Sequence, residues 1–173
     1  MTHAHLFRSM TFTLSMLLLA APPALQAHDL SYNAELPPSE LAADRLQAYS
    51  VQHGNNNRDT ISQKGNSMIA SVGQWGQGNA SNVVQNGTGN VVYSEQYGSN
   101  NTATYFQYGH GNTATGYQVG QSNELSISQT TSHGIASASQ YGNLNSAAIV
   151  QTRPGAAAPL FQMGNGLGIT VFR

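Results

Sequence analysis

Side-chain amides are the functional groups of this sequence that recur with a fixed spacing. Glutamine returns at every eleventh residue from Gln52 to Gln162 without a slip, and asparagine follows five residues later in every second unit from Gln52 to Gln140. A buried amide without a partner costs roughly 1 to 3 kcal/mol. Identical amides stacked every ~4.8 Å avoid this cost, because each donates to one neighbour and accepts from the other. The predicted amide ladder consists of Gln52, Gln63, Gln74, Gln85, Gln96, Gln107, Gln118, Gln129, Gln140, Gln151, Gln162, Asn57, Asn79, Asn101, Asn123 and Asn145.

Groups that could support other chemistry show no such order. The histidines His53, His110 and His133 occupy unrelated positions of the repeat, and the seven acidic residues form no repeated pair. No serine lies in a nucleophile motif such as Gly-x-Ser-x-Gly. We therefore expect no catalytic residue, cofactor or metal, and we predict that the protein is not an enzyme. Asp59 stands out because it occupies an inward-facing position: its charge costs little if the first repeat is solvated and is unexplained if buried.

The elements that must position the amides are short strands separated by tight turns. Glycine follows two residues after the glutamine in nine of the eleven units and is absent only at Thr131 and Arg153, so a turn is expected at each unit. The seven residues between turns then form a strand. The turn glycines are Gly54, Gly65, Gly76, Gly87, Gly98, Gly109, Gly120, Gly142 and Gly164.

Alternation within these strands divides them into two kinds, so the true period is 22 residues. One kind carries the bulky inward residues Ile61, Val83, Tyr105, Ile127, Ile149 and Val171, and the other carries small ones such as Ala114 and Gly116. Large residues of one sheet would therefore meet small residues of the other across a narrow core. The predicted fold is all-β: an amyloid-like, two-sheet β-solenoid of about six strand-turn-strand-turn rungs over residues 46–173, with low-complexity disorder as the alternative.

The first part of the chain lacks this period. Residues 1–27 resemble a signal peptide, because Arg8 precedes an apolar stretch from Met10 to Ala21 and Ala27 offers a cleavage site. An uncleaved anchor is the alternative. Residues 28–45 are predicted to be a flexible leader, with a short helix over 39–46 as the alternative. With 8% charged residues and a net charge of −1, the chain has no electrostatic basis for binding nucleic acid.

The repeat units resemble those of the curlin family, the subunits of curli. Residues 74–85 and 96–107 are similar to its Gln-x-Gly-x-x-Asn repeat, and residues 28–47 resemble the leader that directs curlins to their secretion pore. The resemblance implies export through an outer-membrane pore with accessory proteins. It also implies assembly, with itself and with the major curlin subunit, into an extracellular, surface-associated amyloid fibre (fimbrium) of biofilms.

Within that family the chain resembles the minor subunit, which nucleates the fibre, more than the major fibre subunit, which is the alternative. Met68 replaces the asparagine in the second unit, asparagine occurs in both kinds of strand, and the last repeat is degenerate and ends in Arg173. We expect the regular middle, residues 74–129, to act as the template. Residues 153–173, in which Pro159 removes a ladder donor, are expected to anchor the subunit.

Two further expectations concern the surface. Nothing in the sequence looks like a polar cap, so both ends of the solenoid should accept another strand. A soluble β-helix adhesin or carbohydrate-binding protein, the distant alternative, would need capped ends. One edge is aromatic and could form a stripe that contacts a neighbouring filament, with simple packing over the turn as the alternative. Its residues are His53, Trp75, Tyr97, Val119, Tyr141 and Met163.

Overall fold

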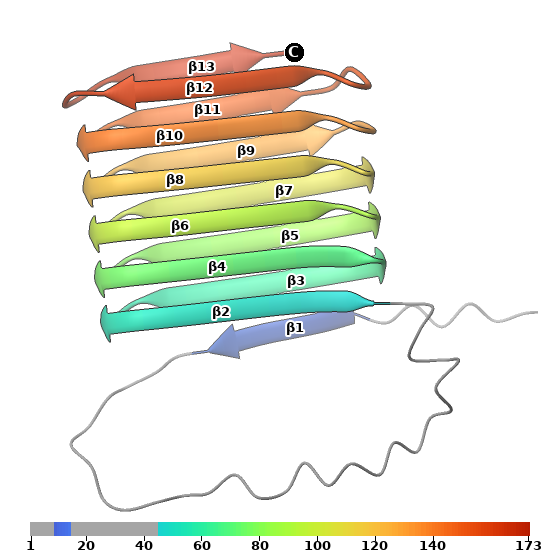
Figure 1. The fold of residues 1–173 in the computed structure, drawn as a ribbon, viewed down its shortest axis with the longest axis horizontal. Helices are drawn as coiled ribbons and strands as arrows, with labels where there is room; N and C mark the ends of the chain where they lie inside the picture. Colours follow the sequence, from blue (N-terminus) through green and yellow to red (C-terminus); the bar gives the residue numbers. More distant parts are fainter. Residues whose placement is uncertain (1–8, 15–44) are drawn as a thin grey trace, which may run out of the picture.

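The computed structural model describes residues 9–14 and 45–173, and these form strands stacked into a flat rod (Figure 1). The described residues contain no helix, and hence none long and apolar enough to span a membrane. The strands are β1 (Ser9–Leu14), β2 (Leu46–Asn55), β3 (Arg58–Asn66), β4 (Met68–Gln77), β5 (Ala80–Thr88), β6 (Val91–Ser99), β7 (Thr102–His110), β8 (Thr113–Gln121), β9 (Glu124–Thr130), β10 (Ile135–Asn143), β11 (Ser146–Gln151), β12 (Ala157–Met163) and β13 (Gly168–Phe172).

Two parallel sheets face each other. One has the order β3-β5-β7-β9-β11-β13, with β1 added beside β3, and the other has the order β2-β4-β6-β8-β10-β12. Partners within each sheet are 22 residues apart, as in the pair of Gln74 with Gln96. Twelve strands at two per rung make six rungs. The predicted β-solenoid with 22-residue rungs is therefore confirmed.

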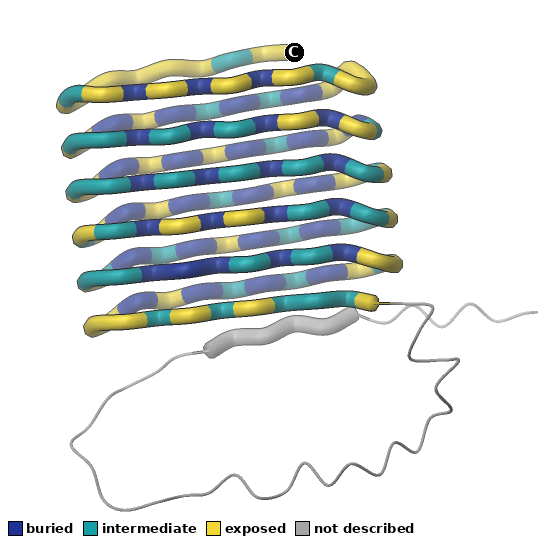
Figure 2. The backbone as a smooth tube through the Cα atoms, viewed as in Figure 1, coloured by how far each residue is buried: buried dark blue, intermediate teal, exposed yellow. Residues whose placement is uncertain are grey.

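The core is a thin layer between the sheets, and Figure 2 shows buried residues alternating with more exposed ones along β3 to β12. Tyr105 is fully buried and donates a hydrogen bond to Ser94 Oγ in the opposite sheet, at 3.1 Å. Beside it lies Gly116, where an added Cβ would approach the Tyr105 hydroxyl and Leu125. The large Tyr105 of one sheet therefore lies against the small Ser94 and Gly116 of the other, as the sequence predicts. Val171, in the last rung, is only partly buried.

The turns contain fewer residues than the sequence predicts, because most strands continue through the glutamine and the glycine that follows it. The glycines two residues after each glutamine have φ values of 113 to 136° and stack directly on one another. A second residue with positive φ follows two positions later, for example Gly89 after Gly87. Where the glycine is absent, at Thr131 and Arg153, β9 and β11 end earlier, at Thr130 and Gln151.

Among the strands of the described residues, β1 alone runs antiparallel to its neighbour. It pairs antiparallel with β3, with Leu14 opposite Asp59. It lies within residues 1–27, which the sequence predicts to be removed as a signal peptide. The predicted leader, residues 28–45, lies outside the described residues except for Arg45. Loss of residues 1–27 would leave the edge of β3 open.

Candidate functional site: amide ladders and rod ends

Two ladders of glutamine run along the rod, one beside each row of turns. In each, the Nε2 group donates to Oε1 of the glutamine 22 residues later at 2.7–2.9 Å. These glutamines are almost fully buried, except for Gln52, which lies on the end strand β2 and has a neighbouring strand on one side only. One ladder joins Gln52, Gln74, Gln96, Gln118, Gln140 and Gln162, and the other joins Gln63, Gln85, Gln107, Gln129 and Gln151.

Each buried glutamine also ties the two sheets together. Its second Nε2 hydrogen goes to a backbone carbonyl 16 residues earlier, on the facing strand, as in Gln96 to Ala80 O at 3.0 Å and Gln107 to Val91 O at 3.0 Å. The side chain therefore closes the end of the core while its amide is fully used. This contact was not anticipated from the spacing, which concerns only identical residues on successive rungs.

The asparagines stabilise the turns. Asn101 Nδ2 donates to the carbonyl of Gly120 in the next rung at 3.0 Å and to Tyr97 O in its own turn at 3.3 Å. Asn101 Oδ1 accepts from the backbone N–H and the Nδ2 group of Asn123, at 3.0 and 3.1 Å. The predicted asparagines Asn57, Asn79, Asn101, Asn123 and Asn145 all lie in this row. They thus bond mainly to the backbone, in addition to one another.

A second, shorter row of asparagines was missed among the predicted site residues. Asn90 and Asn112 are fully buried in the opposite row of turns, and Asn90 Oδ1 accepts from the Asn112 backbone N–H at 3.0 Å. The available signal was that both follow a glutamine by five residues, like the predicted set. Met68 and Gly134 occupy the same slot in the rungs below and above, so this row does not extend further.

Asp59 is the exception in the otherwise neutral interior. Its side chain is 2% exposed and faces the core between Ser50 and Ser81. Burial raises the pKa of the Asp59 carboxyl from 3.8 to about 6, and the nearby hydroxyls and the Thr60 backbone oppose the rise only in part. Asp59 Oδ1 and the two serine hydroxyls all lack a hydrogen bond of good geometry. The first rung is therefore not a solvated one when a strand covers β3.

The two ends of the rod differ in their backbone donors. Outward-facing residues send their N–H groups toward the C-terminal end, as in Ala80 to Asn101 O at 2.8 Å and Ile135 to Ala156 O at 2.8 Å. On β12 the outward residue Pro159 has no N–H, so the open C-terminal edge lacks a donor at its centre. β2 contains no proline, so the N-terminal edge of its sheet keeps every donor.

The side-chain amides differ at the two ends as well. Gln151 and Gln162 have no glutamine in a following rung. Their Nε2 groups donate instead to carbonyls five residues later, Ala156 O at 3.0 Å and Leu167 O at 3.2 Å. At the other end, no donor from the described residues reaches Oε1 of Gln52 or Gln63. Every strand of the middle, residues 74–129, is already paired on both sides, so templating by this segment stays a prediction that the folded rod does not explain. The edges that can accept a strand lie only at the ends.

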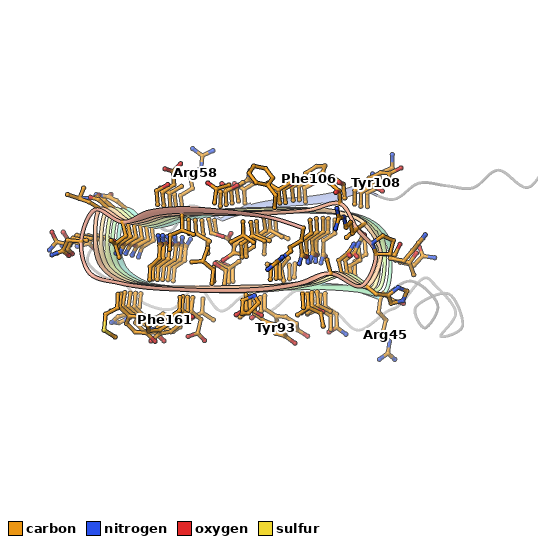
Figure 3. All side chains as sticks on the ribbon, turned by 90° about the horizontal axis from the view of Figure 1, so that it is seen from above. Arg45, Arg58, Tyr93, Phe106, Tyr108 and Phe161 are labelled. Carbon is orange, nitrogen blue, oxygen red and sulfur yellow. The ribbon has the colours of Figure 1, made fainter. Side chains whose placement is uncertain are left out.

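The outer faces of the two sheets carry different side chains, and Figure 3 shows Tyr93 and Phe161 on one face and Arg58, Phe106 and Tyr108 on the other. On the first face Trp75 and Tyr97 stack with centroids 4.5 Å apart and an interplanar angle of 4°. Val119 interrupts the expected stripe, and Tyr117 takes its place. The rings of Tyr117, Tyr141 and Phe161 then continue at 5.5–5.6 Å.

No group of three His, Cys, Asp or Glu residues in the described part of the chain is placed to hold a metal ion. Neither the curated proteins nor the solved structures yield a match to the chain. Residues 106–130, which run from β7 to the end of β9, match the family model of the curlin associated repeat.

Proposed function

We propose that the chain is a non-enzymatic, secreted subunit of a curli-type amyloid fibre at the cell surface. The observation that carries the proposal is that both glutamine ladders run through the whole rod and stop at its ends, where the edges of β2, β12 and β13 are open to a further rung and that of β3 opens once residues 1–27 are removed. An open edge with unpaired N–H and C=O groups is a template for another strand. The curlin associated repeat at residues 106–130 is consistent with this function.

We further propose that the subunit is the minor one, which nucleates the fibre, rather than the major fibre subunit. The difference between the ends supports this role. Without residues 1–27, the N-terminal end offers complete backbone donors and open glutamine acceptors, whereas the C-terminal end lacks the Pro159 donor and has Leu167 where the other rungs carry asparagine. A subunit with only one end that pairs well with an incoming strand can start a fibre of another subunit, but it adds poorly to copies of itself. Its proposed partners are the major curlin, the secretion pore and its accessory proteins.

The seeding activity can be measured with purified proteins. A substoichiometric amount of the secreted chain should shorten the lag of a major curlin, followed by thioflavin fluorescence. Replacement of Gln52 and Gln63 by Leu should weaken this effect, because it removes both acceptors at the N-terminal end. A lag that the unaltered chain leaves unchanged would contradict nucleation.

The degenerate last repeat gives a separate prediction about attachment. A chain that ends at Thr152 loses β12 and β13 but keeps the N-terminal end intact. We expect it to appear in the medium and still to shorten the lag of the major curlin, while the full chain stays with the cells. Fractionation followed by seeding assays tests both points. A truncated chain that remains cell-bound, or that no longer seeds, would show that residues 153–173 are not a separate anchor.

A further inference from the structure

Asp59 is the one acidic side chain among the described residues that faces the interior, and it belongs to the end rung. It is 2% exposed, whereas the other described acidic residues, Glu95 and Glu124, are exposed on the outer faces. The inward residues of the neighbouring strands include no other titratable group: they are Leu46, Ala48, Ser50, Gln52, Met68, Ala70, Val72, Gln74, Asn57, Ile61, Gln63, Asn79, Ser81, Val83 and Gln85. β1 has no titratable residue in its sequence, SMTFTL. Whether the Asp59 carboxylate is solvated or buried therefore depends on whether another strand pairs with β3.

β1 shows what happens when a strand covers β3. With β1 paired along this edge, the Asp59 carboxylate is sealed from solvent, and its Oδ1 has no hydrogen-bond partner. In the secreted chain, which is predicted to lack residues 1–27, an incoming subunit would supply the covering strand. Any such strand would enclose the same carboxylate. A buried carboxylate without adequate partners favours the protonated form.

A second copy is the occupant that continues the columns of the rod. In the 22-residue register, its β12 and β13 place Gln162 next to Gln52 and Val171 next to Ile61. The same register places Ile169 of the second copy against Asp59, with Leu160 against Ser50. The junction therefore extends one amide ladder and part of the apolar core. It offers the carboxylate only apolar side chains from the incoming copy.

We propose that Asp59 makes stacking of a second copy proton-dependent: the C-terminal rung of one copy adds tightly to the N-terminal rung of another only when Asp59 is neutral. This inference rests on the proposed end-to-end assembly and adds a control to it. The missing Pro159 donor weakens the same junction at every pH, because Ala48 O then has no partner. At neutral pH the chain would thus add poorly to itself.

The direction of the effect follows from proton linkage. Asp59 has an ordinary pKa of 3.8 when solvated and a pKa of about 6 when covered, so the stacked state binds the proton more tightly. Stacking is then strongest below pH 3.8, weakens as the pH rises to about 6, and is constant above that. A difference of about two pKa units corresponds to roughly a hundred-fold change in affinity across this window.

The test is the soluble concentration that remains in equilibrium with fibres of the secreted chain, measured by sedimentation from pH 3.5 to 7.5. We expect this concentration to rise roughly a hundred-fold with pH for the unaltered chain. Asp59→Asn, which keeps the shape and removes the charge, should hold it low at all pH values. Glu95→Gln removes an exposed carboxylate on the outer face and should leave the pH dependence unchanged.

The outcomes separate this inference from the proposed function. Fibres whose soluble concentration is independent of pH, or an Asp59→Asn chain that keeps the pH dependence of the unaltered one, would overturn the role of Asp59 while leaving end-to-end assembly in place. Failure of both chains to form fibres at any pH would overturn the proposed assembly itself. Far-UV circular dichroism of Asp59→Asn shows whether the variant retains β structure.

Discussion

Replacement of Gly87 by Ala should destabilise the rod by about 3 kcal/mol. An added Cβ would lie 1.9 Å from the carbonyl oxygen of Gly109 in the next rung, and Gly87 has a φ of 128°, which L side chains rarely adopt. Because the glycines are stacked, neither backbone can move without disturbing the next one. The denaturant midpoint of the monomeric chain, followed by far-UV circular dichroism, measures the loss.

A matched control lies two residues away in the same turn. Gly89 also has a positive φ, 68°, but an added Cβ there meets nothing closer than 3.8 Å. Gly89→Ala should therefore cost only about 1 kcal/mol, the conformational penalty of the left-handed region. Equal losses for the two variants would mean that close stacking of the glycines is not what limits substitution.

Replacement of Gln96, Gln107 and Gln118 together by Leu should destabilise the chain by roughly 4 kcal/mol and slow fibre formation. The Nε2 groups of Gln74 and Gln85 lose their acceptors, and the Oε1 atoms of Gln129 and Gln140 lose their donors. The new leucines cannot satisfy the amides that remain above and below. Denaturant unfolding and thioflavin kinetics measure the two effects.

The control is the same chemical change outside the ladders. Gln77 and Gln121 are exposed at the ends of β4 and β8, and their side chains make none of the ladder bonds. Gln77→Leu and Gln121→Leu together should change stability by no more than about 0.5 kcal/mol. Unchanged assembly of the triple variant, or an equal effect of the control, would show that the amide ladders do not stabilise the rod.

The rung and the ladder were predictable because both depend on one number, the spacing of glutamine. Strict alternation along a strand then decides which residues face inward, so the repeat pattern alone assigns Ile61 and Tyr105 to the core, where both are buried. The bonds from glutamine to the facing strand, such as Gln96 to Ala80 O, depend on how closely the turns bring the sheets together. That distance is not contained in a repeat pattern.

Local departures from the repeat were harder to interpret. Tyr117 replaces Val119 in the aromatic row because outward residues two apart share a face and a long ring reaches the diagonal neighbour. The burial of Asp59 depends on whether a strand covers β3, and the position of Asp59 in the repeat could not decide this. Asn90 and Asn112 were visible in the spacing, but their row is too short to form a regular column.

The mass per length of the fibres tests the central claim most directly, because it counts how many chains occupy each step along the axis. Six rungs at ~4.8 Å each give one chain per about 29 Å of a single filament. Scanning transmission electron microscopy of unstained fibres should therefore find that value, or a small multiple of it where filaments are bundled. One chain per ~4.8 Å, about six times denser within a single filament, would mean that each chain contributes one layer and that the solenoid is not the unit of assembly.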